Sequence, residues 1–244
     1  MIESLSIIIP FYNEEKRIKK ALEEIDYYIN YTKLNVEIIF VDDGSNDNSK
    51  ILIEEYIKQK KPKFDFIKLV QYEKNKGKGY ALKQGVLGSR LAWILTTDID
   101  FSVSLNEISI WEEKKFITKN CDIFFGSRQH KDSVVNSKIY RDFLGGILRI
   151  IINFILGIKM KDTQCGFKLY KKDVAKIIFN QLKVSGFEHD LEIVMIAKKE
   201  NFKITELPIT WTHKEFSKLN IFIDPIKMFF GVIVLKFQSI FKLR

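Results

Sequence analysis

Cysteine is scarce in this sequence, since only Cys121 and Cys165 occur among 244 residues. Two cysteines cannot build the disulfide framework that holds small secreted domains together. A basic and then apolar leader is also lacking before the first strand pattern. We therefore expect a cytoplasmic protein in a reducing compartment. Because 46% of its residues are hydrophobic, the chain can bury a core large enough for one sizeable α/β domain.

A hydrophobic run long enough to cross a membrane is lacking too. DFLGGILRIIINFILGI (142–158) is apolar on nearly every helical face, but it is shorter than the roughly 20 apolar residues that a membrane-spanning helix needs. We expect it to be a core helix or an interfacial helix. Near the C-terminus, lysines flank MFFGVIVL (228–235) on both sides. We therefore predict that residues 216–244 form a basic amphipathic segment that associates with a membrane surface.

Acidic residues are outnumbered by basic ones, with 31 Asp and Glu against 40 Lys and Arg, which gives a net charge of +9. Such a charge favours an anionic partner, either nucleic acid, a phosphorylated substrate or an anionic membrane surface. The aromatic residues are spread along apolar periods and form no cluster for stacking bases. We therefore expect no nucleic acid partner.

The first hundred residues alternate between strand and helix patterns. Apolar, β-branched runs predict strands in SIIIP (6–10), VEIIFVDDGS (36–45), FDFIKLVQY (64–72) and LAWILTTDID (91–100). Segments with helical spacing lie between them. Near-continuous apolar strands of this kind are typical of a parallel sheet covered on both faces. The sequence thus predicts an α/β fold, with a Rossmann-like, mostly parallel central sheet flanked by helices.

Polar and acidic segments follow three of these strands. They are PFYNEE, VDDGS and TTDID. Open parallel sheets bind their ligands outside the carboxyl ends of the strands, so we expect the three segments to converge on one crevice.

Asp98 and Asp100 are the first candidates for a functional site. Alternate residues of a strand point to the same face, so the two carboxylates would lie close together if the strand continued to residue 100. Two like charges at that distance favour a cation between them, and hard cations such as Mg²⁺ or Mn²⁺ bind carboxylates together with substrate phosphates. The alternative is a solvated strand end.

Asp42, Asp43 and Glu14 are further candidates, each with a structural alternative. The aspartates lie at a strand end before Gly44, where a carboxylate can accept hydrogen bonds from a base or ribose, or else form an aspartate turn that caps the next helix. Glu14 is a further acceptor. Its alternative is an acidic residue at a helix N-terminus, where the helix dipole favours it.

The combination of these segments resembles the inverting family 2 glycosyltransferases of the GT-A fold, which use nucleotide-diphospho-sugars. The matching segments are, in order, SIIIPFYNEE, VEIIFVDDGSNDNS, NKGKGYALKQG, TTDID, FFGSR and DTQCGFKLY. With weaker similarity beyond them, they cover residues 6 to about 215. The resemblance implies a GT-A catalytic domain over residues 1–215, followed by C-terminal amphipathic or interfacial helices.

Within that family, the sequence is most similar to the polyprenyl-phosphate (dolichyl-phosphate) glycosyltransferases, particularly the β-glucosyltransferase type. The features that carry this similarity are GSRQHKDSVVNSKIYRDFLG, DTQCGFKLY, FEHDLEIVMIAKK and ELPITWTHKEFSKLN. The resemblance implies transfer of a hexose, first of all glucose from UDP-glucose, to a polyprenyl phosphate at the cytoplasmic face of a membrane. The alternatives are a GDP-mannose donor, a non-lipid glycan acceptor, or a nucleotide-sugar-binding scaffold without turnover.

The resemblance also implies roles for individual residues. Binding of the nucleotide sugar would involve Pro10, Tyr12, Glu14, Asp43, Lys76 and Asp98. Asp98 and Asp100 would hold Mg²⁺ or Mn²⁺ and the diphosphate. Arg128 and Arg141 would bind the acceptor phosphate, for which two-pronged guanidinium groups are suited.

Several other residues have less definite roles. Asp162 is a candidate to act as a base or to position the acceptor, and a helix cap is the alternative. Cys165 has no nearby histidine partner in the sequence, so we predict a packed small side chain instead of a nucleophile. His189 and Asp190 are expected to shape the site, and we do not expect His189 to bind metal.

Overall fold

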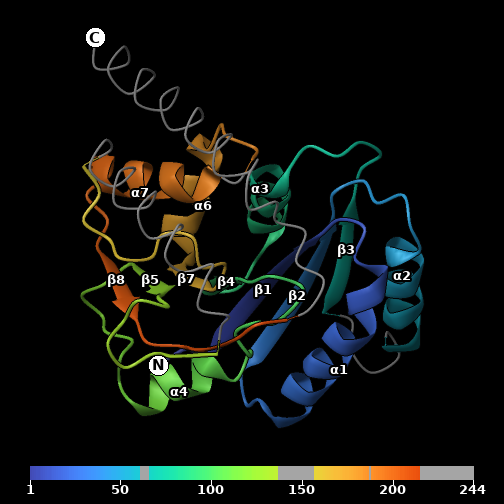
Figure 1. Ribbon diagram of the computed structural model, residues 1–244, viewed down its shortest axis with the longest axis horizontal. Helices are drawn as coiled ribbons and strands as arrows, with labels where there is room; N and C mark the ends of the chain where they lie inside the picture. The colour runs from blue at the N-terminus through green and yellow to red at the C-terminus, as the bar shows by residue number, and fades with distance from the viewer. Residues whose placement is uncertain (61–65, 137–156, 187, 215–244) are drawn as a thin grey trace.

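The computed structural model describes residues 1–60, 66–136, 157–186 and 188–214 (Figure 1). Its centre is a seven-stranded sheet in the order β3-β2-β1-β4-β7-β5-β8. The strands are β1 (Ser4–Phe11), β2 (Asn35–Asp42), β3 (Ile67–Gln71), β4 (Trp93–Thr96), β5 (Ile123–Gly126), β7 (Lys168–Lys171) and β8 (Ile204–Leu207). All pairs are parallel except those of β7, which runs antiparallel to both β4 and β5. The predicted α/β class with a mostly parallel sheet is therefore confirmed.

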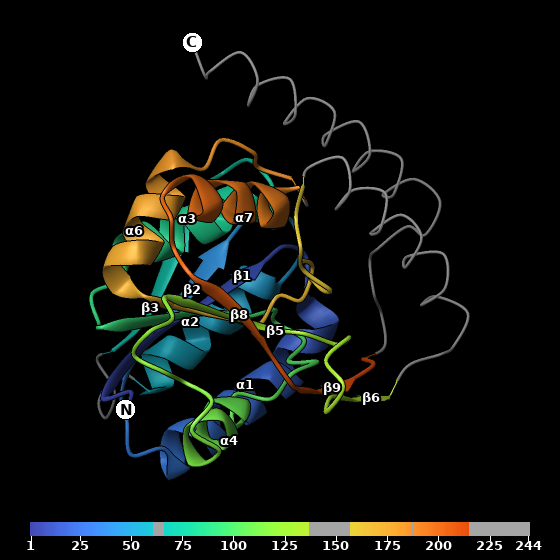
Figure 2. The same cartoon turned by 90° about the vertical axis from the view of Figure 1, so that its left-hand side faces the viewer.

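Helices cover both faces of this sheet (Figure 2). One face carries α1 (Glu15–Tyr31), α2 (Ser49–Lys60) and α4 (Glu107–Glu113), and the other carries α3 (Lys78–Gly88), α6 (Lys172–Gln181) and α7 (His189–Lys199). A short parallel pair, β6 (Val134–Asn136) with β9 (Thr210–Thr212), lies outside the main sheet. Helices on both faces explain why the strands read as continuous apolar runs instead of alternating ones.

Side chains on the two faces of β1 pack into two separate cores. Ile7 and Ile9 pack toward α1, whereas Ile8 between them packs toward α3. Helix α1 completes the first core with a stripe of residues at helical spacing, which includes Ile18 and Ile25. Strand β1 therefore lies between the two cores, and its carboxyl end remains available for a functional site.

Two predicted strand ends need correction. The prediction that the fourth strand continues through Asp100 is wrong, because β4 ends at Thr96. The carbonyl of Asp98 then accepts a hydrogen bond from the amide of Phe101 (3.1 Å), which closes a turn with Phe101 at φ +45°. The first strand also continues one residue past Pro10.

Pro10 is tolerated inside β1 because β4 no longer pairs with β1 at this residue. The ladder between β1 and β4 ends at the Ile8–Thr96 pair, with one further bond from the amide of Thr97 to the carbonyl of Ile8 (3.1 Å). Pro10 has no amide hydrogen to donate, so it fits where no β4 residue faces it. The sheet therefore opens between β1 and β4 at their carboxyl ends.

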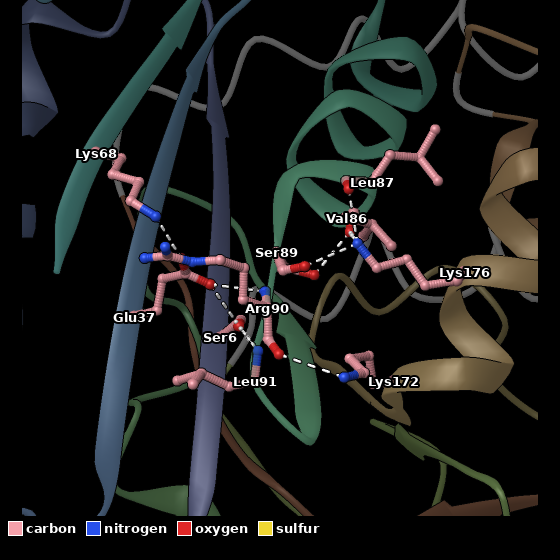
Figure 3. A network of polar contacts seen from close by, with 10 residues as sticks. All are labelled: Ser6, Glu37, Lys68, Val86, Leu87, Ser89, Arg90, Leu91, Lys172 and Lys176. Atoms are coloured by element: carbon pink, nitrogen blue, oxygen red, sulfur yellow. Dashed lines mark hydrogen bonds and ion pairs between the residues drawn. The ribbon is translucent and has the colours of Figure 1, made fainter.

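A buried carboxylate joins the strands near their opposite ends (Figure 3). Glu37 of β2 is 2% exposed and accepts hydrogen bonds from Lys68 Nζ (2.7 Å), Arg90 Nε (3.1 Å) and Ser6 Oγ (2.8 Å). Burial would raise the pKa of Glu37, but its hydrogen bonds to Lys68 and Ser6 and the charge of Lys68 outweigh burial and lower it. The carboxylate thus stays charged and ties together three strands and the segment before β4.

The C-terminal end of α3 is held by a lysine from α6. Lys176 Nζ donates to the carbonyls of Val86 (2.8 Å), Leu87 (2.7 Å) and Ser89 (2.8 Å), as Figure 3 shows. The last carbonyls of a helix have no partner within the helix, so a cation there is stabilising. Helix α3 is thereby fixed at one end while its other end reaches the crevice.

Some sequence predictions fall outside the described residues. They concern Arg141, the segment 216–244 and all of 142–158 except Gly157 and Ile158. In the part of the chain that the structure describes, no helix combines the length and the apolar character needed to cross a membrane.

Candidate active site

The loops after β1 and β2 lie side by side at the open end of the sheet. The amide of Asn13 donates to Ser45 Oγ (3.0 Å), and the amide of Glu14 donates to Ser49 Oγ (2.7 Å). The order of strands reverses between β1 and β4, and such a reversal is where open α/β sheets bind their ligands. The expected convergence of the polar loops after β1 and β2 is confirmed.

Asp43 organises the loop that leads into α3. Its buried carboxylate accepts hydrogen bonds from Tyr72 Oη (2.7 Å), Asn75 Nδ2 (3.0 Å) and the amides of Lys76 (2.8 Å) and Gly77 (2.9 Å). Burial, followed by the hydrogen bond to Asp43, raises the pKa of Tyr72, so the phenol remains a donor. Asp43 therefore fixes the loop that leads into α3, while its part in binding a nucleotide stays a prediction.

Lys76 lies in a small aromatic cluster with Tyr72 and Tyr80. Its exposed ammonium is 4.5 Å from the centre of the Tyr80 ring, 5.5 Å from that of Tyr72 and 3.3 Å from Tyr80 Oη. The two rings meet edge to face at 5.3 Å. The two rings thus hold the Lys76 ammonium in place by cation–π contacts.

Arg17 connects the loop after β1 with the loop after β4. Its Nη1 lies 3.4 Å from Glu14 Oε2 and 3.8 Å from Asp100 Oδ2. Pro10 is buried in β1, and Tyr12 is half-buried just beyond it. The structure therefore brings Glu14 and Asp100 to one arginine that the sequence did not single out, because a basic residue on a helix surface carries no distinctive signal.

Asp98 is held between a lysine and a glycine. Lys78 Nζ, at the start of α3, lies 2.5 Å from Asp98 Oδ1. A Cβ atom on Gly166 would lie 2.7 Å from Asp98 Cγ, well inside van der Waals contact, so the carboxylate fits only because residue 166 has no side chain. Burial would raise the pKa of Asp98, but the charge and hydrogen bond of Lys78 outweigh burial and lower it. Lys78 is a site residue that the sequence analysis missed.

Asp98 and Asp100 do not share one face of a strand, because both lie in the turn after β4. Asp100 Oδ1 accepts a hydrogen bond from the amide of Ser102 (2.9 Å), and its other oxygen faces Arg17. Nevertheless, the charges of both aspartates act on Lys78, and after burial, which lowers the pKa of that lysine, they help to raise it above its ordinary value. The structure therefore places an ammonium group against Asp98, while the metal predicted at Asp98 and Asp100 stays a prediction.

The oxygen ligands present fit a divalent cation that is shared with a substrate. Among the described residues there is no group of three or more His, Cys, Asp or Glu side chains that could hold a metal by themselves. Mg²⁺ and related ions commonly use one or two carboxylates and complete their shell with substrate phosphates and water. Asp98 and Asp100 suit that kind of site, and the Lys78 ammonium beside them marks it as favourable for positive charge.

Arg128 and Asp162 form a two-pronged ion pair between the segment after β5 and the segment before β7. Arg128 Nε and Nη2 lie 2.7 Å and 2.8 Å from the two carboxylate oxygens of Asp162, which also accepts from the Arg128 amide (2.9 Å). Asp162 is 0% exposed, whereas the Arg128 side chain is 29% exposed. A guanidinium group has further N–H donors, so Arg128 keeps some for a ligand.

The position of Asp162 excludes one of its two predicted roles. It caps no described helix, because the next helix, α6, begins only at Lys172. Burial would lower the pKa of Arg128, but the hydrogen bond and charge of Asp162, and less strongly the charge of Asp98, raise it. Asp162 therefore aligns the arginine, and its influence on an acceptor remains a prediction.

Three polar atoms flank this ion pair without partners of their own. Ser127 Oγ, Thr163 Oγ1 and Gln164 Nε2 are buried and have no hydrogen-bond partner within the described part of the structure. They belong to residues within two positions of Arg128 or Asp162 in the sequence. Buried polar groups without partners are costly, so these donors are available to bind acceptor oxygens.

A buried lysine fixes the loop that carries Gly166. Lys168 is 1% exposed, and its Nζ lies 2.5 Å from Asp190 Oδ1 and 2.6 Å from the carbonyl oxygen of Cys165. His189 Nε2 lies 3.2 Å from the same carboxylate oxygen. Burial would raise the pKa of Asp190, but the charges of His189 and Lys168 outweigh it and lower the value. His189 and Asp190 thus help to shape the site, as expected, because Asp190 binds the lysine that fixes the loop with Gly166.

Cys165 is a packed side chain, as predicted. It is 4% exposed, and burial together with the charge of Asp162 raises the pKa of its thiol to about 12. A thiol in that state is not a nucleophile near neutral pH.

Comparison with known proteins gives matches over most of the chain. Residues 6–179 match the sequence profile of glycosyl transferase family 2. A dolichyl-phosphate beta-glucosyltransferase from Dictyostelium discoideum is 33% identical over 96% of this chain and 74% of that protein. The proteins of the same description from Saccharomyces cerevisiae and Homo sapiens are 32% and 31% identical, over 95% and 89% of this chain and 74% and 70% of their own lengths.

Solved structures agree in fold. Glucosyl-3-phosphoglycerate synthase from Mycobacterium tuberculosis, in complex with Mn²⁺, UDP and glucosyl-3-phosphoglycerate, superposes with a TM-score of 0.69 at 12% identity, covering 96% of this chain and 80% of that one. The same enzyme with Mn²⁺ and UDP-glucose gives a TM-score of 0.68. At this identity the likeness concerns the fold alone.

Proposed function

The chain belongs to glycosyl transferase family 2, and we propose that it transfers glucose from UDP-glucose to a polyprenyl phosphate, which gives a β-linked lipid-phosphate sugar. The proposal rests chiefly on one observation, that Arg128 is aligned by a fully buried carboxylate near Asp98. A guanidinium fork close to a carboxylate pair suits a reaction in which one phosphate-bearing substrate meets another. Relatives that are dolichyl-phosphate beta-glucosyltransferases over most of this chain support the same acceptor.

Arg128 would bind the acceptor phosphate through the N–H groups that Asp162 leaves unused. The unpartnered donors of Ser127, Thr163 and Gln164 could supply further hydrogen bonds to the same oxygens. A phosphate offers several anionic acceptor oxygens to the remaining N–H groups of Arg128, whereas an alcohol or a glycan acceptor offers neutral hydroxyl groups. The acceptor end of the site therefore favours a phosphate monoester over a sugar hydroxyl.

On the donor side, Asp98 and Asp100 would hold Mg²⁺ or Mn²⁺ together with the diphosphate of the donor. When bound, such a cation stabilises negative charge on the departing nucleoside diphosphate. The structural neighbours that contain Mn²⁺ with UDP or UDP-glucose support a divalent ion and a uridine nucleotide. Lys76, above Tyr72 and Tyr80, would add positive charge near the nucleotide.

The chemistry needs little from a general base. A phosphate monoester has its second pKa near ~6, so the acceptor is largely dianionic at neutral pH. One of its oxygens attacks the anomeric carbon of glucose, a new carbon–oxygen bond forms, and the bond to UDP breaks with both electrons leaving on the diphosphate. Arg128 offsets the repulsion between the two anionic substrates. A single displacement of an α-linked donor gives the β-linked product.

We further propose that the protein works at the cytoplasmic face of a membrane, where polyprenyl phosphates present their head groups. The net charge of +9 favours an anionic surface. The segments 142–158 and 216–244 are the candidates for the attachment, on the strength of their sequences alone. Sedimentation with phosphatidylserine vesicles that is lost at high salt supports attachment through charge, and no sedimentation at low salt contradicts it.

The proposal is tested by a transfer assay with radiolabelled UDP-glucose and GDP-mannose, each with a short polyprenyl phosphate, the corresponding polyprenol and 3-phosphoglycerate as acceptors. We expect label to move from UDP-glucose into the organic phase with polyprenyl phosphate only. Asp98→Asn and Arg128→Gln should abolish the transfer, whereas Arg90→Gln, an arginine at the other end of β4, should retain it. Transfer only to a water-soluble acceptor, or none from either donor, contradicts the proposal.

A further inference from the structure

Lys78 occupies an unusual place for a basic residue. It is the first residue of α3, whose first turn contains no acidic residue. The N-terminal end of a helix carries partial positive charge, so a lysine is disfavoured there unless something outside the helix compensates. The compensation comes from the loop after β4, because Lys78 Nζ lies 2.5 Å from Asp98 Oδ1.

Two further carboxylates favour a cation at Lys78, although Lys168 also acts on Asp98 and Arg17 lies near Asp100. The carboxylates of Asp100 and Asp190 act on the same ammonium group in addition to that of Asp98. The Asp98 carboxylate packs closely against Gly166, so it cannot move toward the loop that contains Gly166 and remains directed at Lys78. The Lys78 side chain is 25% exposed, which leaves it a route to solvent and to a ligand in the crevice.

We infer that Lys78 is a built-in substitute for the divalent cation, which holds Asp98 in the nucleotide-free protein and is displaced when metal and nucleotide bind together. This inference rests on the function proposed above. An ammonium group and a divalent cation cannot both occupy the same side of Asp98 Oδ1, since the two positive charges would repel at contact distance. The released ammonium then pairs with the diphosphate, which brings negative charge into the crevice.

A defined thermodynamic coupling follows. Metal alone must displace Lys78 into water, so it binds weakly, whereas metal with nucleotide gives the lysine a new partner and binds tightly. By linkage, the nucleotide and the metal strengthen each other's binding by the same factor. Removing the ammonium should therefore strengthen metal binding in the absence of nucleotide and reduce the coupling.

The test measures binding of Mn²⁺ without catalysis, from the loss of the electron paramagnetic resonance signal of free aqueous Mn²⁺ as the full chain is added, with and without UDP. The variant is Lys78→Met. Lys74→Met is the matched control, since it removes one positive charge from an exposed position four residues earlier. Lys78→Arg keeps the charge at the site. Thermal unfolding of each protein checks that the variants fold.

We expect Lys78→Met to bind Mn²⁺ without UDP on the order of tenfold more tightly than the unmodified protein. The factor by which UDP improves Mn²⁺ binding should fall in Lys78→Met, and it should be unchanged in Lys74→Met and largely kept in Lys78→Arg. If Lys78→Met binds Mn²⁺ no more tightly than the unmodified protein, or if neither binds it, the inference is wrong. The transfer assay is scored separately, so transfer with unchanged Mn²⁺ affinities overturns this inference and leaves the proposed function standing.

Discussion

Replacing Gly166 with alanine should disable the site by moving one carboxylate. The new Cβ would lie 2.7 Å from Asp98 Cγ and 2.8 Å from Asp98 Oδ1. Ordinary carbon contacts are about 3.5–4.0 Å, so Asp98 must move by roughly 1 Å. Gly166 is not among the residues with positive φ, so alanine causes no backbone strain and the contact is the whole effect. The Cys165 carbonyl beside it is fixed by Lys168, which prevents the loop from yielding instead.

A displacement of about 1 Å at a catalytic group typically costs about 100-fold in rate, and overpacking costs about 1–3 kcal/mol of stability. We expect kcat/KM for glucosyl transfer to fall about 100-fold in Gly166→Ala, while urea denaturation shows a folded protein that is weakened by no more than that amount. Gly88→Ala is the matched control, because nothing lies within 4 Å of a Cβ at that position. Activity of Gly166→Ala within threefold of Gly88→Ala would refute the reasoning.

Three further predictions concern other parts of the structure. Glu37→Gln should lower the free energy of unfolding by about 1–3 kcal/mol at pH 7. The pKa of Glu37 is lowered in the fold, so its contribution to stability is fully present above the unfolded value of about 4.3. The contribution is lost as pH falls from there through the lowered folded value, so the difference between the two proteins in urea titrations should shrink progressively below about pH 4. Cys165, with a pKa near 12, should not react with Ellman's reagent until the protein unfolds; rapid native labelling there would contradict its packing. Asp162→Asn should raise the acceptor KM roughly tenfold, because Arg128 loses its alignment, with little change in UDP affinity measured by calorimetry. An unchanged acceptor KM would show that the Arg128–Asp162 ion pair does not take part in acceptor binding.

The fold was largely predictable because it follows from local patterns. Apolar runs ended by turn residues located β1, β2 and β3, and helical spacing located α1. The end of β4 was misjudged because Asp98 and Asp100 alternate as strand residues do, yet the turn closed by Phe101 prevails. Strand β7 was not predicted, since KLYK is short and polar at both ends, and its central position depends on the sheet around it.

The site was predictable only as a set of strand ends. The segments with Asp43, Asp98 and Arg128 were identified, but not what each side chain contacts. Lys78 and Gly166 lie 20 and 68 residues from Asp98 in the sequence, and no local period relates residues so far apart. From the sequence, a lysine in a glycine-rich loop is interpreted as a solvated charge. Its pairing with Asp98 follows only when α3 packs on the sheet beside β1 and β2.

The most direct test of the central claim is the ¹H and ³¹P magnetic resonance spectrum of the purified organic-phase product from UDP-glucose and a short polyprenyl phosphate. The account predicts a single phosphodiester phosphorus and a glucose anomeric proton that is coupled to it, with the β configuration. An α configuration would contradict the single displacement. Glucose attached anywhere other than to phosphorus, or only free glucose in the water phase, would contradict the lipid-phosphate acceptor.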